Sequence, residues 1–180
     1  MAEGKLIVIS GASGVGKGTV LSQMMALRKD LSLSVSATTR SPRPGEQDGV
    51  HYYFVTPERF REMIDRDELL EYDAHMDNCY GTPWKQLQEK QSLGPVILDI
   101  DPKGARIVKD KIPDATLVFI MPPSMAELEQ RLRGRNDTPE EQIRLRLQRA
   151  QWEMEQRSWY DHVVVNDDAK RCAGEILGFI

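Results

Sequence analysis

Short apolar runs alternate with helical patterns along the chain. Four of the runs are nearly continuous in Val, Ile and Leu, at 6–9, 96–100, 116–121 and 162–165. Strands buried on both faces of a parallel sheet have this composition, because no alternate position faces water. Two weaker runs, at 33–36 and 52–55, also indicate strands. The alternation predicts an α/β fold with a parallel sheet flanked by helices.

Capping residues mark where several helices begin. Thr56 precedes Pro57, and proline favours the first position of a helix. In the segments 124–127 and 138–141, Ser or Thr is followed three residues later by Glu, which is the capping-box pattern. After Thr138, apolar residues recur at helical spacing and predict one buried helix face, made of Ile143, Leu147, Ala150 and Met154.

The stretch 36–91 lacks the regular alternation seen elsewhere. It includes the turn-rich segment RSPRPGEQDG and then short strand and helix patterns, so we interpret it as a lobe inserted into the core. A second irregular segment, GRNDTP, joins two arginine-bearing helices and indicates a lid. The predicted division is a core of 1–35, 92–125 and 158–180, a lobe of 36–91 and a lid of about 126–157.

The segment GASGVGKGT directly follows the first strand pattern and opens a helical pattern. It satisfies G-x-x-x-x-G-K, whose glycines let backbone N–H groups turn towards anionic oxygens at the positive end of a helix. Lys17 would reach the outer phosphates of a nucleotide. A glycine-rich turn without a ligand is the alternative, which the preceding strand and the lysine disfavour. The predicted phosphate cradle comprises Gly11, Ala12, Ser13, Gly14, Val15, Gly16, Lys17, Gly18 and Thr19.

The cradle departs from the usual pattern at Gly18, where Ser or Thr normally contacts Mg²⁺. Thr19 can supply a hydroxyl, or water can take its place. Asp99 lies at the end of a strand pattern, where a parallel sheet delivers residues to its ligand crevice, so we predict that it contacts Mg²⁺ through water. For both Asp99 and Asp101 the alternative is to cap the helix near Pro102, and for Asp101 that alternative is nearly as good.

Composition narrows the class of protein. The chain has 180 residues, 40 % of them hydrophobic, and a formal net charge of −4, which indicates one globular domain and argues against a general nucleic-acid binder. No apolar stretch has the length of a signal peptide or a membrane span. Cys79 and Cys172 are too few for a disulfide framework or a zinc site. We therefore expect reduced thiols, a cytoplasmic location, and neither a membrane nor a nucleic acid as partner.

A second anion site is indicated by Arg40 and Arg43, which lie three residues apart in a segment stiffened by Pro42 and Pro44. Two guanidinium groups, together with the nearby phenol of Tyr52, suit a dianionic phosphate. The alternative is a solvated turn whose arginines face water. These residues alone do not decide between the two.

The motifs of the whole chain resemble those of the guanylate kinase family. In order they are GASGVGKGT, TTRSPRPGE, NCYGT, LDID, RLRGR and VNDD, and they cover nearly the full length. The resemblance implies an enzyme that transfers the γ-phosphoryl group of MgATP to GMP, with dGMP as a further acceptor. It also implies a P-loop NTPase-type core, an inserted GMP-binding lobe and a helical lid. ATP and GMP are the implied partners and Mg²⁺ the implied cofactor.

The resemblance also assigns roles to single residues. For the GMP phosphate it implies Arg40, Arg43, Tyr52 and Tyr80, and for guanine Ser36, Glu71, Thr82 and Asp101. For the transferring phosphate it implies Lys17, Arg131, Arg135 and Arg146, and for the donor base Asn166. Besides Gly18, the chain departs from the family at Cys79, where an aromatic residue usually precedes Tyr80.

Other interpretations fit parts of the pattern. A catalytically inactive guanylate-kinase-like module that binds proteins is disfavoured by the intact cradle and Lys17. A related kinase acting on a phosphorylated sugar would leave TTRSPRPGE and Glu71 unexplained. Without the resemblance, Glu71 would be interpreted as an exposed acid, and Arg131 as the surface partner of Glu127 four residues earlier.

Overall fold

A parallel sheet forms the centre of the molecule. The computed structural model describes residues 4–75, 77–134 and 139–180, and within them this sheet has the strand order β2-β7-β1-β8-β9. Strand β1 (Leu6–Gly11) pairs in parallel with β7 (Val96–Asp99) and with β8 (Thr116–Met121). The edges are β2 (Ser32–Leu33) and β9 (His162–Val165). All four nearly continuous apolar runs thus form strands, and the predicted parallel sheet is confirmed.

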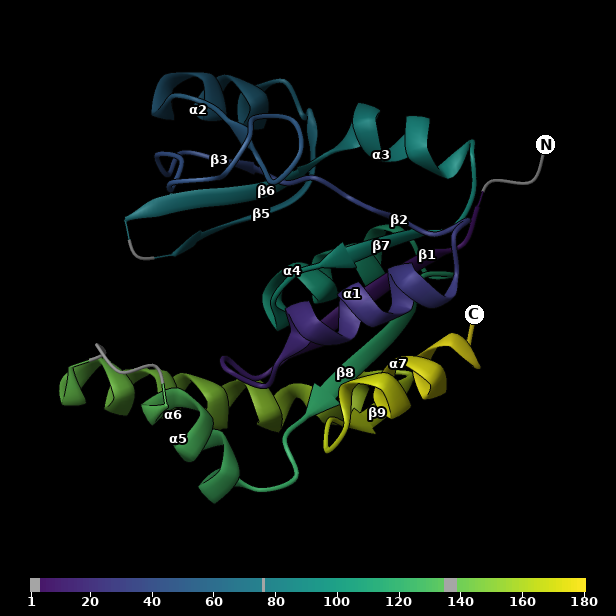
Figure 1. The fold of residues 1–180 in the computed structure, drawn as a ribbon. Coiled ribbons are helices and arrows are strands. Elements are labelled where there is room, and N and C mark those ends of the chain that lie inside the picture. Colours follow the sequence, from purple (N-terminus) through teal and green to yellow (C-terminus); the bar gives the residue numbers. More distant parts are fainter. Residues whose placement is uncertain (1–3, 76, 135–138) are drawn as a thin grey trace.

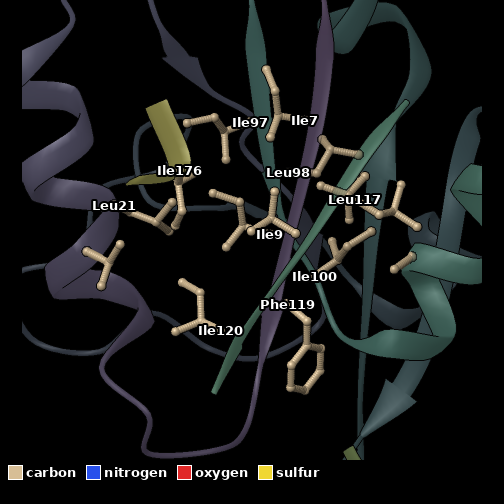
Figure 2. Close-up of a cluster of buried hydrophobic side chains, with 14 of the residues drawn as sticks. Ile7, Ile9, Leu21, Ile97, Leu98, Ile100, Leu117, Phe119, Ile120 and Ile176 are labelled. Atoms are coloured by element: carbon tan, nitrogen blue, oxygen red, sulfur yellow. The ribbon is translucent and has the colours of Figure 1, made fainter. Parts of the chain in front are cut away.

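Helices on both sides of this sheet complete the main core. Helix α1 (Lys17–Leu27) lies beside α7 (Ala169–Leu177), and α4 (Pro102–Lys111) follows β7 (Figure 1). The side chains between them are fully or almost fully buried. Figure 2 shows Leu21 of α1 and Ile176 of α7 beside Ile97 and Ile120, away from Leu98 and Leu117. Both faces of the strands are therefore apolar, as their composition predicts.

A second sheet forms the lobe that the sequence predicts as an insertion. Its order is β4 (Tyr53–Phe54), β3 (Ala37–Thr38), β6 (Asn78–Pro83) and β5 (Leu69–His75), with β5 and β6 antiparallel. Helix α2 (Pro57–Asp65) contributes Phe60 and Met63 to a separate apolar cluster with Ala37 and Leu69. Helix α3 (Trp84–Gln91) then leads back to β7. Figure 1 shows this lobe above the core sheet. The boundaries at 36 and 91 stay predictions.

The two weak runs form shorter strands than predicted. Strand β2 ends at Leu33 and β4 contains Tyr53 and Phe54 only. Residues 34–36 are Ser, Val and Ser, with little apolar surface to bury, and the chain crosses there from the first sheet to the second, where β3 begins at Ala37. Among the described residues only single backbone hydrogen bonds reach this segment, from the Ser34 N–H to the Ile97 carbonyl (2.8 Å) and from the Tyr53 N–H to the Ser36 carbonyl (2.9 Å), so it forms no longer strand in either sheet.

The helical segment after β8 contains α5 (Met125–Arg133), α6 (Glu140–Glu155) and a short 3₁₀ helix, η1 (Gln156–Trp159). The Ser124 hydroxyl accepts a hydrogen bond from the Glu127 N–H (3.1 Å), which confirms that cap. Thr56 caps α2 in the same way through the Arg59 N–H (3.2 Å). Helix α6 begins at Glu140 after Pro139, and its predicted cap, Thr138, lies outside the described residues.

Within the described part of the chain no helix has the length and apolarity to cross a membrane.

Candidate active site

The loop between β1 and α1 has the backbone that a phosphate cradle needs. Gly14 and Gly16 have φ of 88° and 92°, a region in which side chains are strained. A Cβ at Gly14 would lie 2.6 Å from Leu132 Cδ2, and one at Gly16 would lie 2.9 Å from Asn166 Nδ2. Both positions therefore require glycine for conformation and for space.

Two predicted site residues hold the outer side of this loop. The buried Asn166 side-chain amide donates to the Val15 carbonyl (2.8 Å), and the Arg131 guanidinium donates to the same carbonyl (3.1 Å). Arg131 also donates to the Asn166 carbonyl (3.0 Å) and forms an ion pair with Glu127. Both interpretations of Arg131 are thus compatible with the structure, since one guanidinium contacts the cradle and the surface acid. The predicted contacts of Arg131 with phosphate and of Asn166 with the donor base stay predictions.

Lys17 opens α1 and points at the end of β7. Its ammonium group lies 2.6 Å from the Asp99 carboxylate, and the two side chains are 24 % and 37 % exposed. Burial lowers the pKa of Lys17, but the charge and the hydrogen bond of Asp99 raise it by more than burial lowers it. The net shift of the pKa is therefore upward, and the side chain stays cationic. The cradle lysine is therefore preorganised beside a carboxylate that also faces the neighbouring cavity.

That cavity, of about 260 Å³, lies between the core sheet and the lobe. Its lining includes five of the eight residues predicted to bind the acceptor nucleotide, namely Ser36, Tyr52, Glu71, Tyr80 and Asp101. Asp99 lines the same cavity. Because Asp99 contacts Lys17, the cavity opens directly beside the phosphate cradle. We refer to it as the acceptor pocket.

Glu71 is an unusually buried acid in this pocket, with 5 % of its surface exposed. Burial raises the pKa of its carboxyl group to about 7, although a hydrogen bond from the Thr82 hydroxyl to Oε1 (2.6 Å) acts in the opposite direction. A Cβ at Gly104 would lie 2.7 Å from Glu71 Oε2, so glycine lets α4 approach this carboxylate. Thr82, which is also predicted to lie near guanine, contacts Glu71 through this hydrogen bond. It is not among the residues that line the pocket.

Arg40 and Arg43 differ in their placement. The Arg40 guanidinium forms a two-pronged ion pair with Glu46 (2.9 and 2.8 Å) and lies 5.3 Å from the centre of the Tyr52 ring. Hydrogen bonds from Arg40 and from the Arg43 backbone lower the pKa of Glu46 to about 2. Arg43 itself is exposed, and neither arginine is part of the pocket lining. Arg40 is thus held at the pocket's edge beside Tyr52, whereas the structure does not bring Arg43 to it.

Helix α6, which lies in the predicted lid, reaches the loop between β1 and α1. Arg146 of α6 donates from Nε and Nη2 to the Ser13 hydroxyl, both at 3.3 Å. Arg135, which is also predicted to contact the transferring phosphate, lies outside the described residues. The sequence interpretation missed Glu46, which pairs with Arg40, and also Arg149 and Glu153, one and two turns beyond Arg146. The repeat of charged residues at helical spacing from Arg146 was the signal that could have found the last two.

Asp101 shows both features that the sequence left open. Its Oδ1 accepts the Gly104 N–H (2.9 Å) and caps α4, while its side chain lines the acceptor pocket. Asp99 does not cap this helix. Together with the exposed Thr19, Asp99 supplies oxygen atoms near the cradle, and the described residues contain no cluster of three or more His, Cys, Asp or Glu side chains that could hold a metal alone. This donor set fits a hydrated divalent cation delivered with phosphate groups.

Fold and site together define a P-loop α/β protein of the phosphoryl-transfer class, with a second pocket beside its phosphate cradle. A family model described as guanylate kinase matches residues 3–178. The chain is 45 % identical to a guanylate kinase of Prochlorococcus marinus over 98 % of its length and 96 % of the relative's. It is 51 % identical to one of Trichodesmium erythraeum over 93 % of its length and 90 % of the relative's. This chain belongs to the guanylate kinase family.

A solved structure supports the same assignment at the level of the fold. The crystal structure of guanylate kinase from Anaplasma phagocytophilum is 32 % identical and superposes with a TM-score of 0.80. The match covers 99 % of this chain and 85 % of that one. The α/β architecture with its inserted lobe is therefore that of the family.

Proposed function

We propose that this protein transfers the γ-phosphoryl group of ATP to GMP, and to dGMP, giving ADP and GDP or dGDP. One observation carries the proposal beyond family membership. A buried carboxylate, Glu71, lies in the same pocket as Asp99, the ion-pair partner of the cradle lysine. A base-reading acid and a phosphate cradle thus face a common space, as transfer between two nucleotides requires.

The chemistry of guanine fits Glu71. The pairing edge of guanine has neighbouring N1–H and N2–H₂ donors, which one carboxylate can accept side by side. Adenine has an unprotonated N1 there, which would face the carboxylate lone pair to lone pair. Unpaired polar groups in a closed site cost about 10⁴-fold in discrimination. We assign Ser36, Thr82 and Asp101 to the surroundings of the base, and Tyr52, Tyr80, Arg40 and Arg43 to the GMP phosphate.

The reaction needs no general base. The second pKa of a nucleotide phosphate is about 6, so the acceptor is already an anion at neutral pH. Catalysis then depends on aligning two anions and on neutralising the charge that spreads over the γ-phosphoryl oxygens. We assign this neutralisation to Lys17, Arg131, Arg135 and Arg146. Closure of the lid would exclude water and strengthen these interactions.

We propose Mg²⁺ as the cofactor, bound together with ATP. Asp99, through water, and Thr19 are the residues that would hold it. Bound Mg²⁺ would offset the negative charge of the phosphate oxygens. The other groups that would neutralise this charge are protein side chains, namely Lys17 at the cradle and the arginines of the predicted lid.

Gly18 offers a test of the metal assignment. Apart from Gly18 itself, its two chain neighbours and the nearby helix backbone, no described atom lies within 4 Å of a Cβ built at Gly18, so there is space for a serine. We expect Gly18→Ser to lower the Mg²⁺ concentration for half-maximal activity several-fold, since its hydroxyl can contact the ion. Gly18→Ala is the matched control, because it stabilises the helix start equally but adds no ligand. Identical Mg²⁺ titrations for the two variants would contradict the prediction.

Turnover with a panel of acceptors tests the proposed function. We expect ATP-dependent ADP release with GMP at a kcat/KM at least about 10³-fold above that with AMP, CMP or UMP. Comparable rates with all four would contradict the assignment of Glu71. No turnover with any of them would favour a binding module or a sugar kinase, and binding of a phosphopeptide would separate these two.

The raised pKa of Glu71 predicts a pH dependence. Guanine requires the ionised carboxylate, whose population rises as the pH passes through about 7. We expect the KM for GMP to fall about tenfold between pH 6 and pH 8. Parallel measurements on Glu71→Gln correct for the ionisation of GMP itself, and an equal pH dependence in both proteins would exclude the contribution of Glu71.

The same group affects stability with the opposite sign. Its pKa is about 7 in the folded protein and near the ordinary glutamate value of 4.5 in the unfolded chain. Between these values the folded state binds more protons, so Glu71 lowers the free energy of unfolding as the pH rises. Binding and stability should therefore change in opposite directions over this range.

We also propose a cytoplasmic location. Both cysteines, Cys79 and Cys172, are free thiols in the structure, which supports a reducing compartment.

A further inference from the structure

Helix α6 carries a buried acid that the proposed reaction does not use. Glu153 is only 4 % exposed, yet its carboxylate has partners on both oxygens. Oε2 accepts the backbone N–H of Ser13 in the phosphate cradle (2.8 Å), and Oε1 accepts Nε of Arg149 (2.9 Å). Figure 1 shows α6 passing the loop between β1 and α1, which contains Ser13. A buried carboxylate needs such partners, because desolvation of an unpaired charge is costly.

Arg149 continues this contact towards the acceptor pocket. Its Nη2 lies 3.4 Å from Oδ2 of Asp101, and its side chain is part of the pocket lining. The other oxygen of Asp101 caps α4 at Gly104, the residue that packs against Glu71. A continuous chain of contacts therefore runs from the cradle at Ser13, through Glu153 and Arg149, to Asp101 and the base-reading side of the pocket.

One member of this series of contacts, Glu153, lies beside a buried tyrosine. The Tyr160 hydroxyl is buried and has no hydrogen-bond partner among the described residues. Burial raises the pKa of Tyr160, the nearby Ser10 hydroxyl lowers it, and the charges of Asp101 and Glu153 raise it by smaller amounts. Glu153 is thus in a buried environment, where electrostatic interactions are stronger than at the surface, whereas Asp101 faces the pocket.

The spacing of residues along α6 connects this series of contacts to Arg146, the arginine predicted to contact the transferring phosphate. Arg146, Arg149 and Glu153 are three and four residues apart, so they lie on one face of the helix. Arg146 contacts the Ser13 hydroxyl, while Glu153 contacts the Ser13 N–H. The rotation of α6 about its axis, and with it the position of Arg146, is therefore set by contacts at both ends of this face.

We propose that Arg149 and Glu153 are positioning residues that tie the acceptor pocket to the phosphate cradle and hold Arg146 at the point of phosphoryl transfer. This inference rests on the proposed ATP:GMP transfer. The forked guanidinium of Arg149 spans the two carboxylates, Asp101 and Glu153, which a point charge on a flexible stem cannot do equally well. Loss of the bridge would misalign Arg146 without removing any of the residues assigned above to substrate binding.

Single and double variants in steady-state assays with ATP and GMP test the bridge. We expect Arg149→Gln and Glu153→Gln each to lower kcat about 10- to 100-fold, because small misplacements of catalytic groups have effects of this size, and to change both KM values less than about threefold. The double variant should be no slower than the slower single variant, since residues that act as one unit are not additive. Arg149→Lys should fail to restore kcat.

Arg144→Gln is the matched control, because Arg144 is exposed on the same helix. It should keep wild-type kcat. If Glu153→Gln does not fold, Arg149→Gln still tests the bridge, because the Arg149 side chain is 30 % exposed and its loss leaves a smaller buried defect. Rates within twofold of wild type for the foldable variants, a wild-type rate for Arg149→Lys, or additive losses would overturn the inference alone. An inactive wild-type protein would instead overturn the proposed function, and this inference with it.

Discussion

Replacing the cradle lysine, in the variant Lys17→Met, should lower kcat/KM at least about a thousandfold while the protein remains folded, because single groups that stabilise transition-state charge contribute about this much. Methionine keeps the length of the side chain but removes the ammonium group that lies 2.6 Å from Asp99. The carboxylates of Asp99, Asp101 and Glu153 all act on Lys17 in the structure. Without it they would repel the incoming phosphates.

The measurement is ADP release with ATP and GMP, together with the thermal unfolding temperature. Lys170→Met is a suitable control, since Lys170 is exposed in α7, and it should change neither quantity. Near wild-type turnover in Lys17→Met would contradict the role of the lysine. Loss of the folded state would show that the Lys17–Asp99 pair is structural, which its partial exposure argues against.

The second large effect is expected in acceptor choice. Glu71→Gln should reduce the ratio of kcat/KM for GMP to that for AMP about a hundredfold or more, because the amide replaces one acceptor oxygen by a donor. That donor opposes the N–H groups of guanine and can pair with N1 of adenine. The fold should survive, since the glutamine carbonyl can still accept the hydrogen bond of Thr82.

The ratio should be measured at pH 8, where Glu71 is ionised. Glu89→Gln, an exposed acid on α3, is the control and should leave the ratio unchanged. An unchanged ratio in Glu71→Gln would remove Glu71 from the base site. Equal losses with GMP and AMP would indicate a role in folding or closure, and not in reading the base.

Structural features that depend on a few neighbouring residues could be predicted from the sequence. The continuous apolar runs form the core strands, and Ser124 and Thr56 cap their helices as expected. The glycines of the cradle could also be predicted, because their conformation is a property of the local backbone. The weak run at 33–36 was overestimated, since a short apolar pattern does not reveal that the chain leaves one sheet for another there.

The specific partners of polar side chains could not be predicted in the same way, whether they lie near or far in the sequence. The sequence does not decide whether Asp101 caps a helix or binds a ligand, and the structure shows that its two oxygens have separate partners, Gly104 and Arg149. No sequence pattern singles out Glu46, which forms an ion pair with Arg40 six residues earlier. Arg43 was grouped with Arg40 because of spacing, but only Arg40 packs against the aromatic edge of the pocket.

By itself, then, the sequence determined the glycine-rich loop between β1 and α1, the strands of the parallel sheet and the family to which the chain belongs. These features depend on backbone conformation and on hydrophobic periodicity, which are local. Only the tertiary structure decided that Lys17 contacts Asp99, that Glu71 is buried against Thr82, and that Glu153 reaches Ser13 across 140 residues. Such pairs depend on how the lobe and the helices pack on the core, because burial determines which charges must find partners.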